Sequence, residues 1–260
     1  MKNLFKIITA NLYKITHSML IWVHIIIPII GALGLSWYLG YQDKDGFSNL
    51  FDCACIIALI FPVMIGIVTA MLFEQDKNAG KFQNILSVPC SRTVSHTGNI
   101  IALMICGLGS SLLTVGGFGI VNMLMGKTTA PIKEYFIIAL IVFIPNIAMY
   151  VLQYVVCYCL GKGVSIGLGI FNFIIASTME YGQWDNVWKF APCSYANRIL
   201  RVEYSKRLLV NMGKNVKEII SKQFPSYSLD LLVVGIITVL IIVCFYIWST
   251  RWEGCLSTDE

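Results

Sequence analysis

The sequence predicts an all-α protein that crosses a membrane several times, and three observations lead to this fold class. Hydrophobic residues make up 57% of the 260 residues and charged residues only 13%, whereas a soluble domain carries about 25% charged residues. The apolar residues fall in blocks of about 20, the length needed to cross a hydrocarbon core of about 30 Å. Trp and Tyr residues border these blocks. The composition therefore excludes an ordinary soluble enzyme and a disordered chain.

Six apolar blocks define the expected transmembrane helices. They lie near residues 19–40, 50–73, 99–125, 135–160, 164–180 and 229–249. Trp and Tyr are enriched at the level of the lipid headgroups. Trp37 and Trp248 stand near the ends of their apolar blocks, where that level is expected. Pro28, Pro62 and Pro145 lie inside blocks, where we expect them to kink helices without preventing a span.

The first 17 residues predict an amphipathic helix that lies on the membrane surface. Leu4, Ile8 and Leu12 share one face of a helix, whereas Lys2 and Lys6 lie on another side. A basic amphipathic helix binds the interface between water and lipid; an unstructured tail is the alternative. We expect the whole chain, 1–260, to form a single transmembrane domain, because its length leaves room for only one modest polar loop.

The charges around the first block favour a cytoplasmic N-terminus. Lysines precede this block and the loop after it, 43–45, is net acidic, and the first span often sets the orientation of the others. Six spans then return the C-terminus to the cytoplasm. On this topology 11 of the 19 Lys and Arg residues lie outside, many of them in the loop 181–228. This conflicts with the positive-inside rule, although a long loop has less influence on orientation.

Several motifs that carry chemistry in other proteins are incomplete here. Residues 126–128, Gly-Lys-Thr, resemble the end of a phosphate-binding loop, but that motif needs a glycine where Val121 stands. We therefore expect no nucleotide or Mg²⁺ site in this chain. Most of the nine cysteines lie inside apolar blocks, without the four ligands that structural zinc needs, so no metal site is expected. The scattered cations form no surface for nucleic acid.

Residues 163–167 match the G-x-S-x-G pattern of serine hydrolases, with Ser165 at the centre. An intramembrane serine protease needs a base within about 3 Å of its nucleophile, and the only histidine inside a block is His24, in the first span. The protease is therefore a distant alternative, and no catalytic residue is expected. We prefer the interpretation that glycines 161, 163, 167 and 169 let neighbouring helices pack closely.

The polar segment 74–98 contains a short apolar set with helical spacing. Phe82, Ile85 and Leu86 stand at i, i+3 and i+4, which places them on one face of a short helix. Asp76 is expected to cap the start of this helix, and Pro89 to end it. Such a helix buries little by itself, so it either docks into a partner's groove or folds back onto its own spans.

The run 73–92, FEQDKNAGKFQNILSVPCSR, directly follows the second block. It resembles the coupling-helix region of ABC-2-type permeases, and it is most similar to the permeases of lantibiotic-immunity ABC transporters. The matching residues are Glu74, Ala79, Gly80, Phe82, Gln83, Asn84, Leu86, Ser91 and Arg92. The six spans and the amphipathic start agree with this family over the whole length. The sequence departs from the family pattern at His96 and Gly98, where Lys is expected.

The resemblance implies an ABC-2 (type V exporter-like) permease in the bacterial cytoplasmic membrane. It implies a second, related permease subunit, two ATPase subunits that bind ATP and Mg²⁺, and a lantibiotic peptide that is expelled to protect the cell. The residues that it assigns to ATPase coupling are Glu74, Phe82, Ile85, Leu86 and Arg92. The alternatives are an ABC-2 exporter of another drug, lipid or peptide, and a membrane anchor or sensor.

The loop 181–228, expected outside the cell, combines cations with aromatic side chains. We expect a helix over 194–210 and a shorter amphipathic stretch over 213–224, both at the outer membrane surface. The candidate contacts with substrate or within a lid are Trp184, Trp188, Tyr195 and Tyr204. The basic residues suit anionic lipid. We prefer the interpretation that the loop is a lid over the outer vestibule.

Polar side chains inside a membrane are costly and are therefore candidates for function. Asn146, Gln153 and Asn172 lie inside the fourth and fifth blocks. Asn146 and Gln153 are seven residues apart, which places them on the same face of a helix. They line the interface between two permeases or they bond neighbouring helices to each other, and we favour the second interpretation.

Overall fold

The computed structural model describes residues 2–42, 44–87, 90–127, 129–180, 184–212, 218–220, 224 and 226–254. These residues form helices and connecting turns, without a β-strand among them, which confirms the all-α fold class. The helices are α1 (Lys2–Thr16), α2 (Met19–Leu39), α3 (Gly46–Asn78), α4 (Gln83–Leu86), α5 (Arg92–Leu124), α6 (Ile132–Phe143), η1 (Ile144–Asn146), α7 (Ile147–Leu160), α8 (Lys162–Thr178), η3 (Trp188–Phe190), η4 (Pro192–Ser194), α9 (Tyr195–Asn211) and α11 (Tyr227–Arg251).

Among the described residues, five helical segments are long and apolar enough to cross a membrane: α2, α3, α5, the continuous segment Ile132–Leu160, and α11. The sixth predicted span is α8, an apolar helix of 17 residues. Seventeen residues extend about 26 Å, at the lower limit for crossing the hydrocarbon core. At Pro145 the 3-10 turn η1 interrupts the α-helical pattern between α6 and α7. Pro28 and Pro62 lie inside α2 and α3.

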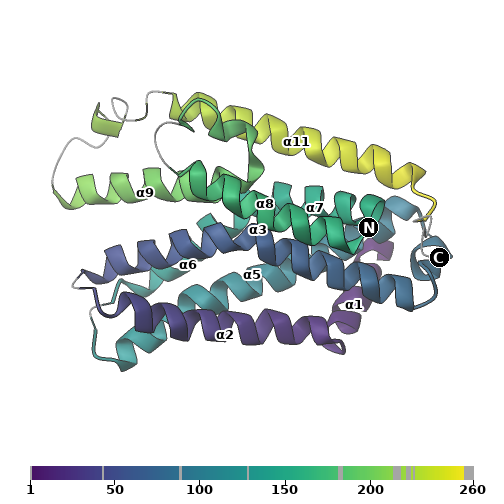
Figure 1. The fold of residues 1–260 in the computed structure, drawn as a ribbon, viewed down its shortest axis with the longest axis horizontal. Helices are drawn as coiled ribbons and strands as arrows, with labels where there is room; N and C mark the ends of the chain where they lie inside the picture. The colour runs from purple at the N-terminus through teal and green to yellow at the C-terminus, as the bar shows by residue number, and fades with distance from the viewer. Residues whose placement is uncertain are drawn as a thin grey trace.

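The spans lie side by side along the long axis of the molecule, and both termini are at the same end (Figure 1). The purple helix α1 lies at that end, and α9 extends from the opposite end (Figure 1). The central helix is α3, whose most apolar window is 61% buried, compared with 28% for α2 and 11% for α11. Because α2 and α11 expose so much apolar surface, they lie at the outside of the bundle.

The helices α3 and α8 approach each other at small residues. A Cβ atom on Gly66 of α3 would lie 2.8 Å from the carbonyl oxygen of Ser165, and one on Gly169 would lie 3.0 Å from that of Pro62. The Ser165 hydroxyl donates to the Gly66 carbonyl at 3.2 Å. Of the four glycines expected to form this surface, Gly169 makes the close contact. A Cβ at glycines 161, 163 or 167 would meet no atom within 4 Å.

We expect Gly66→Ala to destabilise the protein by about 1–3 kcal/mol, because the added methyl group overpacks a contact with backbone. The matched control is Gly167→Ala, which lies in α8 where an added Cβ meets no atom within 4 Å. This change is expected to keep or raise stability, since Ala is favoured over Gly inside helices by about 1 kcal/mol. Thermal unfolding in detergent measures both effects. Equal melting temperatures for the wild type and Gly66→Ala would contradict the close approach.

Candidate functional site

A strained turn follows the central helix at the end of the bundle that holds the termini. The three consecutive residues Gly80, Lys81 and Phe82 have φ angles of 109°, 51° and 67°. Left-handed conformations cost about 1–2 kcal/mol for residues other than glycine, so contacts elsewhere must hold Lys81 and Phe82 in place. The Phe82 amide donates to the Asp76 carbonyl at 3.2 Å. The turn reverses the chain, and the one-turn helix α4 follows it.

Of the three apolar side chains at positions 82, 85 and 86, two are buried and one is exposed. Phe82 and Ile85 are each only 4% exposed, whereas Leu86 is 39% exposed. The Phe82 ring packs 5.2 Å from that of Phe73 and 5.5 Å from that of Trp252. The segment thus folds back onto its own spans through Phe82 and Ile85, which was one of the two open interpretations. The surface left for a partner consists of Asn78, Ala79, Gly80, Lys81, Gln83, Leu86 and Ser87.

The expectation that Asp76 caps the short helix is wrong, because α3 continues through Glu74 and Asp76 to Asn78. The residue before α4 is Phe82, which provides no side-chain cap. Glu74 instead pairs with Lys162 at the start of α8, with 2.5 Å between the carboxylate and the ammonium group. Both side chains are about half exposed. Pro89, the expected end of the short helix, lies outside the described residues.

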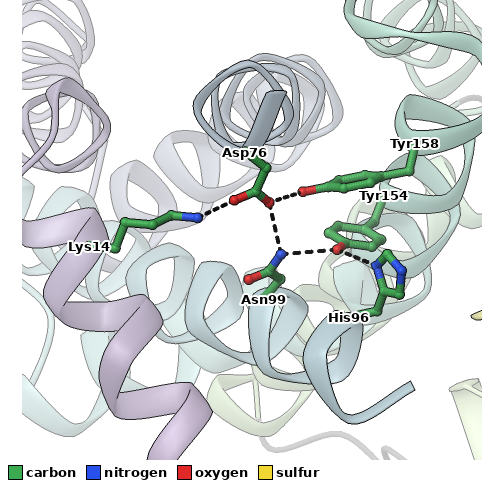
Figure 2. A network of polar contacts seen from close by, with 6 residues as sticks. All are labelled: Lys14, Asp76, His96, Asn99, Tyr154 and Tyr158. Carbon is green, nitrogen blue, oxygen red and sulfur yellow. Dashed lines mark hydrogen bonds and ion pairs between the residues drawn. The ribbon is translucent and has the colours of Figure 1, made fainter. Parts of the chain in front are cut away.

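Asp76 is the centre of a buried polar network, shown in Figure 2. Its side chain is 1% exposed and forms an ion pair with Lys14 of α1. The same carboxylate accepts from the Tyr158 hydroxyl at 2.5 Å and from the Asn99 amide at 3.1 Å. The network therefore joins α1, α3, α5 and α7.

Two further residues extend the network away from the carboxylate. The Asn99 amide also donates to the Tyr154 hydroxyl at 3.2 Å, and the His96 Nδ1 lies 2.8 Å from the same hydroxyl (Figure 2). His96 and Asn99 are three residues apart on α5, and Tyr154 and Tyr158 are four apart on α7, so each pair shares a helix face. These spacings were the available signal for a site that our sequence reasoning missed.

A buried carboxylate is stable only when its charge is paired and its oxygens accept hydrogen bonds. Asp76 meets both requirements with donors from three other helices, and it lies one turn of helix before the strained turn. A displacement of the turn therefore acts directly on the residue that holds α1, α5 and α7 together. Asp76 therefore connects the end of α3, next to the turn, to α1, α5 and α7.

Arg92, the first residue of α5, fixes the end of the last span. Its Nη1 donates to the Trp252 carbonyl at 2.9 Å, so it binds within the chain in this structure. The Trp252 ring in turn lies 4.6 Å from the His96 ring, edge to face. Gly98, one of the departures from the family pattern, lies where α1 crosses α5, since a Cβ there would be 2.4 Å from an Ile7 methyl carbon.

At the opposite end of the bundle, three of the four candidate aromatic residues are built into the fold. Trp188 is buried and packs edge to face on Tyr195, whose hydroxyl donates to the Lys189 carbonyl at 2.9 Å. Tyr204 stacks on Phe51 with 4.1 Å between ring centroids. Trp184 is 36% exposed and is the one of the four with a free face. Most of 213–224 lies outside the described residues.

The cations of α9 are paired within the protein. Arg198 donates to the Met179 carbonyl at 2.7 Å and to Asp185 at 2.5 Å. Arg201 donates to the Glu180 carbonyl, and Arg207 pairs with Glu134 and Glu203. These contacts attach α9 to the ends of α6 and α8.

Cys193 is buried beside this helix, and burial raises the pKa of its thiol to about 11.

The three candidate polar residues inside the spans lie in separate places. Gln153 donates from α7 to the Pro62 carbonyl of α3 at 2.8 Å, which is the favoured bond between neighbouring helices. Asn146 donates at 2.8 Å to the Val142 carbonyl in its own helical segment. Asn172 is 9% exposed, and its Nδ2 has no partner among the described residues.

The Ser165 hydroxyl donates to the Gly66 carbonyl, a hydrogen bond from α8 to α3. The His24 Nδ1 lies 2.8 Å from the Ser110 hydroxyl, and the His96 Nδ1 lies 2.8 Å from that of Tyr154. Neither imidazole therefore has Ser165 as its partner. Within the described part of the chain, no group of three His, Cys, Asp or Glu side chains is placed to hold a metal ion.

Comparison with protein families gives a match over most of the chain. The family model described as ABC-2 family transporter protein matches residues 7–178, which include α8 and all the residues of the Asp76 network. Comparisons with curated proteins and with solved structures gave no match.

We expect Asp76→Asn to destabilise the protein by about 3 kcal/mol, because it leaves Lys14 without its anionic partner in a largely buried pair. It is also expected to release α1, which limited proteolysis detects as faster cleavage within residues 2–18. The matched control is Glu74→Gln, which breaks a half-exposed ion pair and is expected to cost less than about 1 kcal/mol. Equal protection of α1 in both variants would show that the network does not hold this helix.

Proposed function

We propose that this chain, which belongs to the ABC-2 family of transporter proteins, expels a lantibiotic-type antimicrobial peptide from the bacterial cytoplasmic membrane and so protects the cell. It serves as the membrane permease of an ABC transporter. Two ATPase subunits, which bind ATP and Mg²⁺, power the transport, and a second, related permease completes the assembly. The observation that carries this proposal is the position of the Asp76 network beside the turn 80–82.

The link between ATP hydrolysis and transport runs through that turn. The exposed residues from Asn78 to Ser87 dock on an ATPase subunit, and closure of the ATPase pair pushes the turn. Because Asp76 lies beside it and binds donors from α1, α5 and α7, the push moves these helices together. Glu74 and Arg92 bracket the segment and fix it to α8 and to the end of α11.

The proposed orientation has both termini and the turn in the cytoplasm and α9 outside. An exposed Val210→Cys on α9, in a cysteine-free background, is then expected to react with an impermeant maleimide in intact cells. The control Lys81→Cys, on the exposed turn, is expected to react only after lysis. The native Cys193 is unsuited to this test because it is buried. Reaction of Lys81→Cys in intact cells would reverse the orientation.

The docking surface is tested with Leu86→Asp, which places a charge on the exposed apolar residue of α4. Burying a leucine contributes about 1.5–3 kcal/mol, so affinity for the ATPase is expected to fall about tenfold to hundredfold. Co-purification of the ATPase with the tagged chain measures this change. Val210→Asp is the matched control, since Val210 is exposed at the other end of the molecule. A similar loss of ATPase in both variants would count against docking at α4.

The substrate is tested by resistance of cells that produce this chain with its ATPase. We expect a raised inhibitory concentration for a lantibiotic and no change for an unrelated membrane toxin, and an ATPase variant that cannot hydrolyse ATP should abolish the effect. Trp184→Ala is expected to weaken resistance more than Val187→Ala, a neighbouring exposed residue, because the indole offers the larger apolar contact. Protection against another drug but no lantibiotic would favour the alternative exporter.

A further inference from the structure

A cavity of about 310 Å³ lies between α2, α3, α5 and α7, and none of the residues of the Asp76 network line it. Its walls are almost entirely apolar and include Ile27, Phe61 and Tyr150. Three exposed residues on its lining, Ile27, Gly34 and Ile60, belong to α2 and α3. The cavity therefore has an open side on the apolar surface of the bundle, which lipid tails contact in a membrane.

One side chain gives this apolar cavity a specific polar group. His24 lines the cavity and is 8% exposed. Its Nδ1 lies 2.8 Å from the Ser110 hydroxyl, whereas its Nε2 is buried without a hydrogen-bond partner in the described part of the chain. An unsatisfied polar atom in hydrocarbon is costly, so a ligand that completes this hydrogen bond would be favoured.

Pro28 determines which hydrogen bond the imidazole still needs. Proline has no N–H, so Pro28 leaves the carbonyl of His24, four residues before it, without its helical partner. The Ser110 hydroxyl donates its proton to this carbonyl at 3.0 Å. The Cys106 carbonyl, which has its own helical donor, also lies 3.0 Å from this hydroxyl. Whichever of the two carbonyls receives the hydroxyl proton, the hydroxyl oxygen is left to accept from the His24 Nδ1–H. A neutral imidazole carries one N–H, so Nε2 is a bare acceptor that requires a donor.

From this geometry we infer a binding site for an uncharged amphiphile: an apolar chain or ring with one hydroxyl or amide N–H, whose donor binds His24 Nε2. The volume is at the lower end of the range for small-molecule sites, about 300–1,000 Å³, and the apolar walls exclude a charged group. This site lies within one chain and does not depend on the identity of the transported peptide.

The probe is a long-chain alcohol that carries a photoreactive diazirine, compared with a diazirine alkane of the same length. Both are applied to membranes that contain the full-length chain with its ATPase, and the labelled peptides are mapped by mass spectrometry. We expect the alcohol to label the segments around Val23–Leu35 and Gly107–Thr114 about three to ten times more than the alkane, the gain from one hydrogen bond.

Two kinds of variant separate the hydrogen bond from the cavity itself. His24→Phe removes the acceptor and keeps an aromatic ring, so the ratio of alcohol to alkane labelling should fall to about one. Gly31→Leu fills the cavity, because a Cβ there lies 3.5 Å from the Thr114 methyl carbon across it, and should abolish labelling by both probes. Gly34→Leu is a second filling variant. The control Gly109→Leu, next to Ser110 but outside the lining, meets no atom within 4 Å at Cβ and should change neither probe.

Competitors identify the source of the ligand. Unlabelled dodecanol should displace the alcohol probe, whereas phosphatidylcholine, which has no hydroxyl or amide donor, should not. Equal competition by phosphatidylcholine, together with equal labelling by alcohol and alkane in the wild type, would replace the inference with an ordinary acyl-chain contact. Undiminished labelling in folded Gly31→Leu and Gly34→Leu would overturn the site altogether.

Discussion

The pairing of one buried carboxylate constrains the end of the bundle that holds the termini. Asp76 is 1% exposed, in a chain whose surroundings offer little water, so its charge needs several donors at once. Those donors come from α1, α5 and α7, which are distant in the sequence. The position of α1 and the distance between α3 and its neighbours are therefore set by one group. The aromatic packing of Phe82, His96 and Trp252 closes the same region against solvent.

The prolines impose a second constraint of the same physical kind. Inside a bilayer, each backbone group must find its partner within the protein. The His24 carbonyl, which Pro28 leaves without a helical partner, accepts from the Ser110 hydroxyl. The carbonyl of Pro62 itself accepts from the Gln153 amide. Polar side chains at these two positions thus bind α2 to α5 and α3 to α7. Small residues such as Gly66 then bring the backbones of α3 and α8 together.

The sequence alone predicts where the spans lie, but it predicts only part of the candidate site. Apolar blocks predict the helices, and Pro145 predicts an irregularity where η1 interrupts the α-helix, because hydrophobicity and proline geometry act locally. The sequence does not decide whether Phe82 and Ile85 are buried within the chain or in a partner. An apolar face with spacing i, i+3, i+4 can pack equally well against a partner's groove and against the chain's own spans. The sequence around Asp76 predicts a helix cap, because nothing local points to its donors Lys14 and Tyr158, which lie about 60 and 80 residues away. Only the tertiary fold reveals such pairings.

The strained turn and the network support each other. Left-handed backbone at Lys81 and Phe82 persists only if other contacts outweigh its cost, and the Phe82 ring supplies them by packing on Phe73 and Trp252. The Phe82 amide also donates to the carbonyl of Asp76, whose side chain holds three other helices. The turn is therefore fixed to the end of α3, which is the property that the proposed coupling to an ATPase subunit requires. A flexible connection at this position would lack that property, so the proposed coupling favours a short segment that contacts within the chain hold in place.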